Sequence, residues 1–194
     1  MYQKLLIILL LNINILNARG ELERLGDVLT LAPFGMLIVS LGLKDYEGAA
    51  QLTLGALATQ GTIELIKKSN QAFHDSGATP PFARRPCCED YKGMPSGHSG
   101  GAFSAAAYVY YRYGWKPALP LIAISVLTAY TRIDARKHSV YQTAVAAGIA
   151  WSWGYFFTTK YGQKMIRNHN LLVIPVLQDD FGGLYYGVHL SYRF

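Results

Sequence analysis

The sequence predicts an all-α fold: a membrane-embedded helical bundle that ends in a short C-terminal β-hairpin. Hydrophobic residues make up 51% of the 194 residues and charged residues only 15%, so the chain forms one domain with a large apolar interior or a lipid-facing surface. Long stretches without any charged residue recur between charged turns, at 28–43, 48–63, 117–131 and 139–159. Only the tail alternates apolar and polar residues with a period of two, as a strand does.

The first eighteen residues have the composition of an export signal. Lys4 precedes an apolar run over residues 5–11, and the small residue Ala18 follows at a suitable cleavage position. Leu16 does not suit the position two residues before that cleavage site, so an uncleaved anchor helix stays open as the alternative. In both cases, residues 1–18 direct the N-terminus out of the cytoplasm.

The next part of the chain, residues 19–165, is predicted to be the helical bundle. A loop over residues 71–95 interrupts it, because Gly77, Pro80, Pro81 and Pro86 break helices. The expected helices are 26–43, 47–70, 97–113, 117–131 and 138–160.

Membrane embedding rests on small residues and on aromatic residues. Gly and Ala recur at close spacing, which is typical of helices that pack tightly in lipid, and aromatic residues gather at 151–157 as in an interfacial belt. However, most of the apolar stretches are shorter than the roughly 20 residues that span a bilayer. A soluble periplasmic bundle therefore remains the alternative.

The tail, residues 166–194, is expected to form the hairpin. Residues 171–177 are apolar, and in the segment 184–194, after Gly182-Gly183, the later part alternates apolar with polar side chains. One hairpin cannot close a barrel, so we interpret it as an edge or capping element.

The net charge of +6 and the sequence pI near 9.3 do not by themselves identify the class of partner, which depends on how the basic residues are arranged. Nucleic acid is not expected, because no basic stripe interleaves with aromatic residues on a polar helix. Lys160, Lys164 and Arg167 follow the last long helix, where cations face anionic lipid. A solvated basic face is the alternative for these three residues.

Three short segments carry the chemistry. Residues 95–98 read Pro-Ser-Gly-His at the start of an expected helix, where free N–H groups favour an anion. Arg85-Pro86 precedes them, and Arg132 is followed six residues later by His138. Guanidinium and ammonium groups bind phosphoryl oxygens, and histidine can act as a nucleophile or as a titrating acid. The pattern indicates phosphoryl transfer.

These segments resemble the type 2 phosphatidic acid phosphatase superfamily over roughly residues 58–150. The family pattern is a Lys upstream of Arg-Pro, then Pro-Ser-Gly-His, then Ser-Arg-x5-His-x3-Asp. The chain departs from it at three points. Thr131 replaces the Ser, the gap from Lys67 to Arg85 is long, as in some compact lipid A phosphatases, and Gln142 stands where the Asp is expected.

The resemblance implies a role for each motif residue. His138 is expected to attack phosphorus and form a phosphohistidine, and His98 to protonate the leaving oxygen. Gln142 would orient His138 through its carbonyl oxygen, without the charge of an Asp, so Gln142→Asp is expected to raise the rate. No metal and no cofactor is expected, because cations already neutralise the phosphate. The phosphate-binding residues are Lys67 (preferred to Lys68), Arg85, Ser96, Gly97 and Arg132.

The function that this implies is a metal-independent phosphatase acting on a lipid: lipid A, polyprenyl diphosphate or phosphatidate. It would lie in the inner membrane of the bacterial envelope, with its active site facing the periplasm. Its partners would be the phosphorylated lipid and the membrane; the oligomeric state is left open. Two alternatives remain: a soluble class A-like acid phosphatase, and a catalytically weak phospholipid-binding protein.

Overall fold

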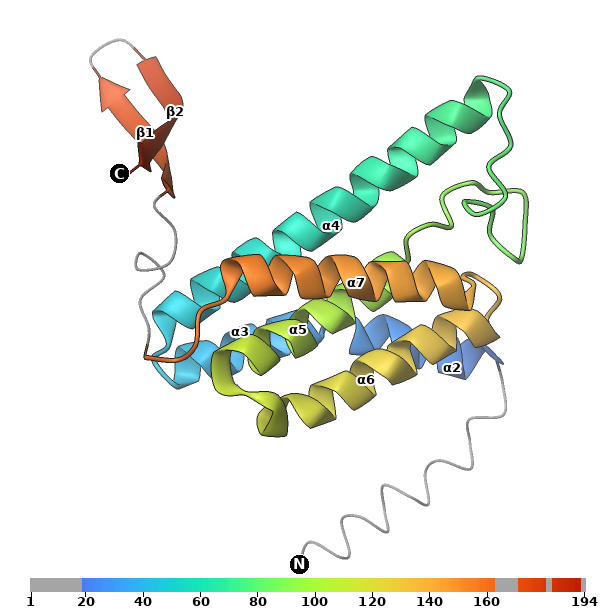
Figure 1. The fold of residues 1–194 in the computed structure, drawn as a ribbon, viewed down its shortest axis with the longest axis horizontal. Coiled ribbons are helices and arrows are strands. Elements are labelled where there is room, and N and C mark those ends of the chain that lie inside the picture. Colours follow the sequence, from blue (N-terminus) through green and yellow to red (C-terminus); the bar gives the residue numbers. More distant parts are fainter. Residues whose placement is uncertain (1–18, 163–170, 181–182, 193–194) are drawn as a thin grey trace, which may run out of the picture.

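The computed structural model describes residues 19–162, 171–180 and 183–192. Over residues 19–162 the fold is helical, as the sequence predicts (Figure 1). The expected signal or anchor at 1–18, and the residues Lys164 and Arg167, lie outside the described residues. The helices are α2 (Arg19–Leu29), α3 (Ala32–Gly42), α4 (Tyr46–Asp75), α5 (Gly97–Tyr113), α6 (Trp115–Asp134) and α7 (Val140–Phe157).

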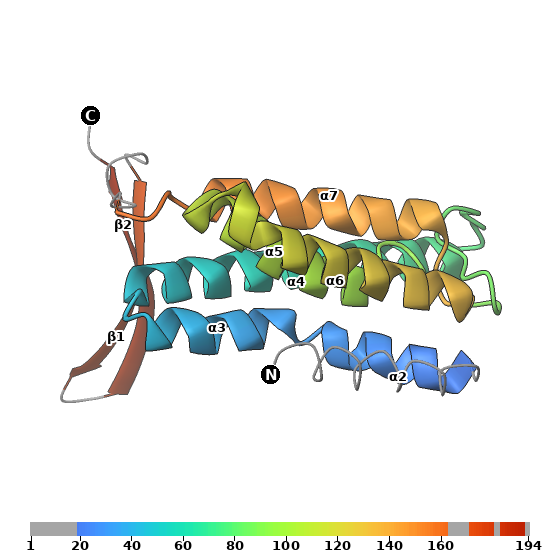
Figure 2. The ribbon, with the colours of Figure 1, turned by 90° about the horizontal axis from the view of Figure 1, so that it is seen from below.

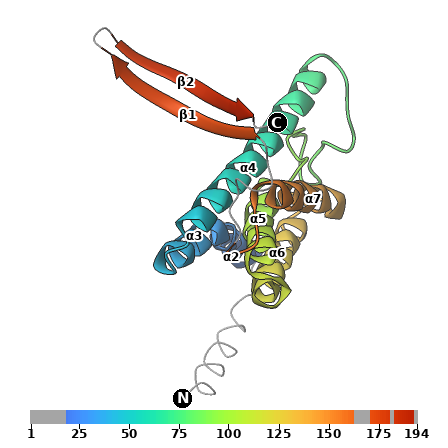
Figure 3. The same ribbon diagram turned by 60° about the vertical axis from the view of Figure 1, so that its left-hand side comes forward.

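Helix α5 lies at the centre of the bundle and packs against each of the other five helices (Figure 3). Its buried face consists mostly of small side chains, and Ala102, Ala105, Ala106 and Ala107 have no exposed surface. Small residues let neighbouring helices approach closely. The N-terminus of this central helix, with the Pro-Ser-Gly-His motif, is therefore surrounded by other elements.

The helix expected over 26–43 is two helices instead of one. Helix α2 ends at Leu29, and α3 begins at Ala32 with Pro33 in its first turn, where a missing N–H costs nothing. The two helices follow one another along the same side of the bundle (Figure 2). Together, Gly20–Gly42 is long and apolar enough to cross a membrane, by length and composition.

The boundaries of the last two helices also differ from expectation. Helix α6 continues to Asp134, three residues beyond the expected end at 131. Helix α7 begins at Val140, because the Ser139 side chain accepts a hydrogen bond from the Gln142 N–H and the Gln142 side chain accepts one from the Ser139 N–H. His138 was expected to open this helix; instead it lies in the turn before the cap.

A buried ion pair holds together the end of α5 that is remote from the motif. Arg112 donates to the Asp45 carboxylate from Nε at 2.8 Å and from Nη2 at 2.5 Å, and Tyr113 donates to it at 2.7 Å. Burial alone would raise the pKa of Asp45, but the hydrogen bonds from Arg112, Tyr113 and the Gly48 N–H outweigh it and lower the pKa to about 2. The charged pair is therefore retained at neutral pH.

We expect Asp45→Asn to lower the free energy of unfolding at neutral pH by about 3–5 kcal/mol, because it leaves the Arg112 guanidinium buried without a counter-charge. A depressed carboxyl pKa stabilises the fold above its unfolded value, so the difference from wild type should vanish only as the pH falls towards 2. Thermal unfolding in detergent measures this. Glu21→Gln, which breaks the exposed pair with Arg24, is the control and should change little.

At the C-terminal end, β1 (Leu171–Asp180) pairs antiparallel with β2 (Gly183–Tyr192). Leu171 lies opposite Tyr192, and Asp180 lies opposite Gly183. The first strand extends three residues beyond the expected run of 171–177.

Candidate active site

Four segments far apart in sequence bring the motif residues to one end of the bundle. Lys67 comes from α4, Arg85 from the loop before α5, His98 from the first turn of α5, and His138 from the turn after α6. Electrostatic effects show that these groups are neighbours: the Lys67 ammonium lowers the pKa of both histidines, and Arg85 also lowers that of His138. The three motifs thus form one site.

One ring nitrogen of His138 makes a hydrogen bond that holds the ring, and the other keeps a lone pair for reaction. Its side chain is buried, and its Nδ1 lies 2.7 Å from the Gly93 carbonyl oxygen. Because a carbonyl only accepts hydrogen bonds, Nδ1 carries the hydrogen, and in the neutral ring Nε2 keeps its lone pair.

The surroundings of His138 keep it neutral. Burial lowers its pKa; the Gly93 carbonyl opposes this, and the positive charges of Arg85 and Lys67 reinforce it, so the pKa is about 4. A neutral imidazole at physiological pH is the state in which Nε2 is nucleophilic.

The expected orienting partner, Gln142, has a different main role. Its Nε2 donates to the carbonyl oxygens of Phe82 and Arg84, both at 2.9 Å, and its Oε1 accepts from the Ser139 N–H at 3.1 Å. Gln142 raises the pKa of His138 less than Gly93 does. The principal orienting acceptor is therefore the Gly93 carbonyl, and Gln142 chiefly fastens the Arg85 loop to α7.

This geometry reverses the expected effect of a carboxylate at position 142. Glu in place of Gln142 keeps the acceptor for the Ser139 N–H but sets a carboxylate oxygen against two carbonyl oxygens. We expect Gln142→Glu and Gln142→Asp to lower both turnover and stability, the latter by about 1–3 kcal/mol. Phosphate release and thermal unfolding measure the two effects. A faster Gln142→Asp enzyme would mean that the residue at position 142 does orient His138.

His98 shares a carboxylate with Arg132. Its Nε2 lies 2.9 Å from Asp27 Oδ1, and Arg132 Nη1 lies 3.1 Å from the same oxygen. Burial and the Arg132 charge lower the pKa of His98, Asp27 raises it, and Lys67 lowers it further. Its side chain is 41% exposed, so unlike His138 it can reach a group entering from outside.

Sequence reasoning missed Asp27 and the glycine before it. A Cβ on Gly26 would lie 2.0 Å from Thr131 Oγ1 and 2.7 Å from Arg132 Nη2, so only glycine lets α2 approach α6 this closely. The one available signal was position, since Asp27 is the last charged residue before the apolar stretch that begins at Val28. Its contact with His98, 71 residues later, has no local signature.

The structure favours Lys67 over Lys68 as the site lysine. The Lys67 side chain is only 14% exposed and pairs with Glu64 at 3.0 Å, whereas Lys68 is exposed. A Cβ on Gly97 would lie 3.3 Å from Lys67 Nζ. The ammonium therefore lies against the first turn of α5.

Arg85 and Ser96 differ in how far their polar side-chain atoms are already hydrogen-bonded. Arg85 Nε lies 3.0 Å from Asp90 Oδ2, without the alignment of a hydrogen bond. Ser96 is fully buried, and its Oγ accepts from the N–H and the hydroxyl of Ser99. Ser96 thus caps α5, and the first N–H groups of that helix lack intrahelical partners.

Other candidate ligands are few in the described part of the chain. It contains no group of three or more His, Cys, Asp or Glu residues placed to hold a metal ion. Cys87 and Cys88, in the same loop as Arg85, are joined by a disulfide.

Comparison with known proteins identifies the family of this chain. Residues 52–166 match the model of the PAP2 superfamily. The chain is similar to a lipid A 4′-phosphatase of Helicobacter pylori (strain J99), with 46% identity over 173 residues that cover 89% of this chain and 85% of the relative. No solved structure matches it significantly. On both the family match and the relative, the chain belongs to the PAP2 superfamily, that of the type 2 phosphatidic acid phosphatases.

Proposed function

We propose that the protein hydrolyses a phosphomonoester of lipid A, at the 4′ position, through a phosphohistidine on His138 and without a metal. The substrate follows from the name of the similar Helicobacter pylori protein. The observation that carries the mechanism is the neutral, oriented His138 beside Lys67 and Arg85.

In the first step, the Nε2 lone pair of His138 forms a bond to phosphorus while the bond to the sugar oxygen breaks. Protonated His98 gives its proton to that oxygen, which leaves as an alcohol. In the second step, water attacks the phosphohistidine, neutral His98 takes a proton from the water, and the P–N bond breaks to restore His138. Lys67, Arg85, Arg132 and the N–H groups at Gly97 hold the negative oxygens in both steps.

A cleft beside the site, lined by both polar and apolar side chains, suits the sugar headgroup. It has a volume of about 560 Å³, and Arg84, Arg85, Ser139 and Gln142 contribute to its walls. Its size falls within the range of sites for small molecules. Arg84 is half exposed, so it can contact a second anionic group of the substrate.

We place the protein in the inner membrane with this site facing the periplasm. Large apolar side chains are exposed on several helices: Phe34 by 65%, Ile38 by 71%, Leu65 by 67% and Tyr155 by 73%. Exposed apolar surface of this extent indicates a lipid or protein partner. We also propose that residues 1–18 are the export signal or anchor, residues 19–165 the phosphatase bundle and residues 166–194 the hairpin tail.

Phosphate release from purified lipids tests the proposal. The detergent-solubilised protein is incubated with lipid A, a polyprenyl diphosphate, phosphatidate and a small soluble phosphomonoester. We expect lipid A to be the best substrate, with activity retained in a chelator and inhibited by vanadate, which mimics the five-coordinate transition state. Preference for the small ester would favour the soluble acid phosphatase instead, and loss in chelator with recovery on adding magnesium would contradict the metal-free mechanism.

Asp27 should set the pH range of the general acid. Because Asp27 raises the pKa of His98 by its charge and its hydrogen bond, Asp27→Asn lowers that pKa further. His98 is then protonated only at lower pH, and the alkaline limb of kcat/KM shifts to lower pH. The pH profiles of the variant and wild type on one substrate measure the shift, since the titration of the substrate is common to both. An unchanged alkaline limb would mean that His98 is not the acid.

A further inference from the structure

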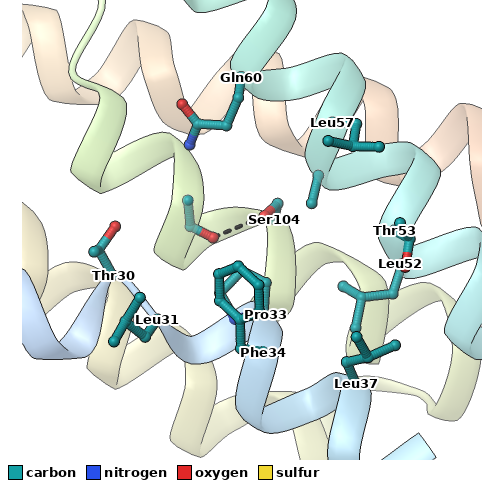
Figure 4. A pocket seen from close by; sticks show the side chains of 12 residues that line it. Thr30, Leu31, Pro33, Phe34, Leu37, Leu52, Thr53, Leu57, Gln60 and Ser104 are labelled. Atoms are coloured by element: carbon teal, nitrogen blue, oxygen red, sulfur yellow. Dashed lines mark hydrogen bonds between the residues drawn. The ribbon is translucent and has the colours of Figure 1, made fainter.

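An apolar cavity of about 290 Å³ lies between α3, α4 and α5, next to the site but outside the residues assigned to catalysis. Leu37, Leu52 and Leu57 lie on one side of it, and Thr30 and Gln60 lie on the other (Figure 4). Most of the wall is thus apolar, the edge formed by Thr30 and Gln60 is polar, and Thr53 and Ser104 are further polar residues in the lining.

Thr30 and Gln60, at the polar edge, donate hydrogen bonds to backbone carbonyls in the first turn of α5. Thr30 Oγ1 donates to the His98 carbonyl oxygen at 3.0 Å, and Gln60 Nε2 donates to the Gly97 carbonyl oxygen at 3.0 Å. Gly101, which also lines the cavity, allows no side chain: a Cβ there would lie 2.8 Å from Thr30 Oγ1. The cavity therefore begins at the backbone of the residues that face the phosphate.

The rim of the cavity is apolar and exposed. Leu31 is 53% exposed, Phe34 65% and Leu57 65%. Two of these residues belong to Gly20–Gly42, the segment that is apolar enough to cross a membrane. An opening of this kind suits an occupant that arrives from lipid.

We propose that this cavity binds one acyl chain of the lipid substrate and so selects acylated over non-acylated phosphate esters. The inference rests on the proposed function, because it assigns a place to a second part of the same molecule. The volume is near the lower end of ligand sites, about 300 Å³, which accommodates one chain and not several. The polar edge places the head of that chain beside His98, where the phosphorylated sugar must lie.

Leu57→Trp tests the assignment by filling the cavity from its exposed rim. Each buried methylene is worth roughly fourfold in affinity, so excluding two or more should lower kcat/KM for lipid A by at least about tenfold. The same disaccharide phosphate after chemical removal of its acyl chains should be hydrolysed within about twofold of the wild-type rate, since the reacting groups are unchanged. Leu57→Ala should act in the same direction on lipid A, to a smaller extent.

Leu54→Trp is the matched control. Leu54 lies on the same helix, is 45% exposed and does not line the cavity, so this variant should leave both activities unchanged. Circular dichroism melts verify that all three variants fold.

The outcomes separate the two proposals. If wild type is active on both substrates and Leu57→Trp lowers both activities alike, or neither, the acyl-chain site is overturned and the phosphatase function stands. An equal loss on lipid A with Leu54→Trp would also overturn it, because the effect would then belong to the membrane-facing surface. Wild type inactive on both substrates would overturn the proposed function and this inference with it.

Discussion

Replacing His138 by alanine is expected to lower phosphate release by a factor on the order of 10⁵, the scale of losing a catalytic nucleophile. The substitution removes the atom that bonds to phosphorus, and the remaining cations can only stabilise a slow attack by water. His138 donates a hydrogen bond from Nδ1 to the Gly93 carbonyl oxygen, so the variant also leaves that acceptor without its donor. The resulting stability cost is on the order of 1–3 kcal/mol, small beside the loss of activity.

The phosphoenzyme provides a measurement that a merely structural role would not affect. Wild type quenched in denaturant during turnover of ³²P-labelled substrate should carry a label that acid removes and alkali does not, as expected for a phosphohistidine. His138→Ala should carry none while still melting cooperatively. His74→Ala serves as the histidine control, because His74 stacks on Tyr91 and has no part in the proposed reaction. Label on the His138→Ala protein would mean that another residue is the nucleophile.

The sequence predicted those features that local patterns control. The bounds of α5 agree with expectation at both ends, because Ser96 caps one end and Gly114 follows the other. The motif spacing also placed His98, Arg85 and Lys67 in one site. The first of these depends on capping chemistry and the second on the order and spacing of the motifs.

The errors arose where two local signals compete or where distant residues meet. At the start of α7, Ser139 is a better N-cap than His138, so the helix begins two residues later and Gln142 enters the capping box. The acceptor for His138, Gly93, lies in an irregular loop 45 residues earlier, and its carbonyl leaves no trace in the side-chain sequence. Asp27 meets Arg132 only because Gly26 lets two helices touch.

Arg132→Ala is expected to lower kcat/KM by about 10²–10³, the cost of removing one donor group that stabilises transition-state charge. The guanidinium is 2% exposed and contacts Asp27, the Glu23 carbonyl oxygen and Thr131. A guanidinium carries five N–H bonds, so these three contacts, the ones found among the described residues, leave two for phosphate oxygens. We therefore propose two roles for Arg132, binding the phosphate and holding α2 against α6.

Two variants separate these roles. Arg132→Lys keeps the charge but not the paired donors that match a phosphate, so it should recover only part of the activity. Lys137→Gln removes a second tether to the same helix, the ion pair with Glu23, and takes nothing from the phosphate. If holding α2 were the main role, Lys137→Gln would reproduce much of the Arg132→Ala loss. If phosphate binding dominates, Lys137→Gln stays near wild type, and vanadate affinity falls only in the Arg132 variants, because the five-coordinate mimic needs the same charge stabilisation as the transition state.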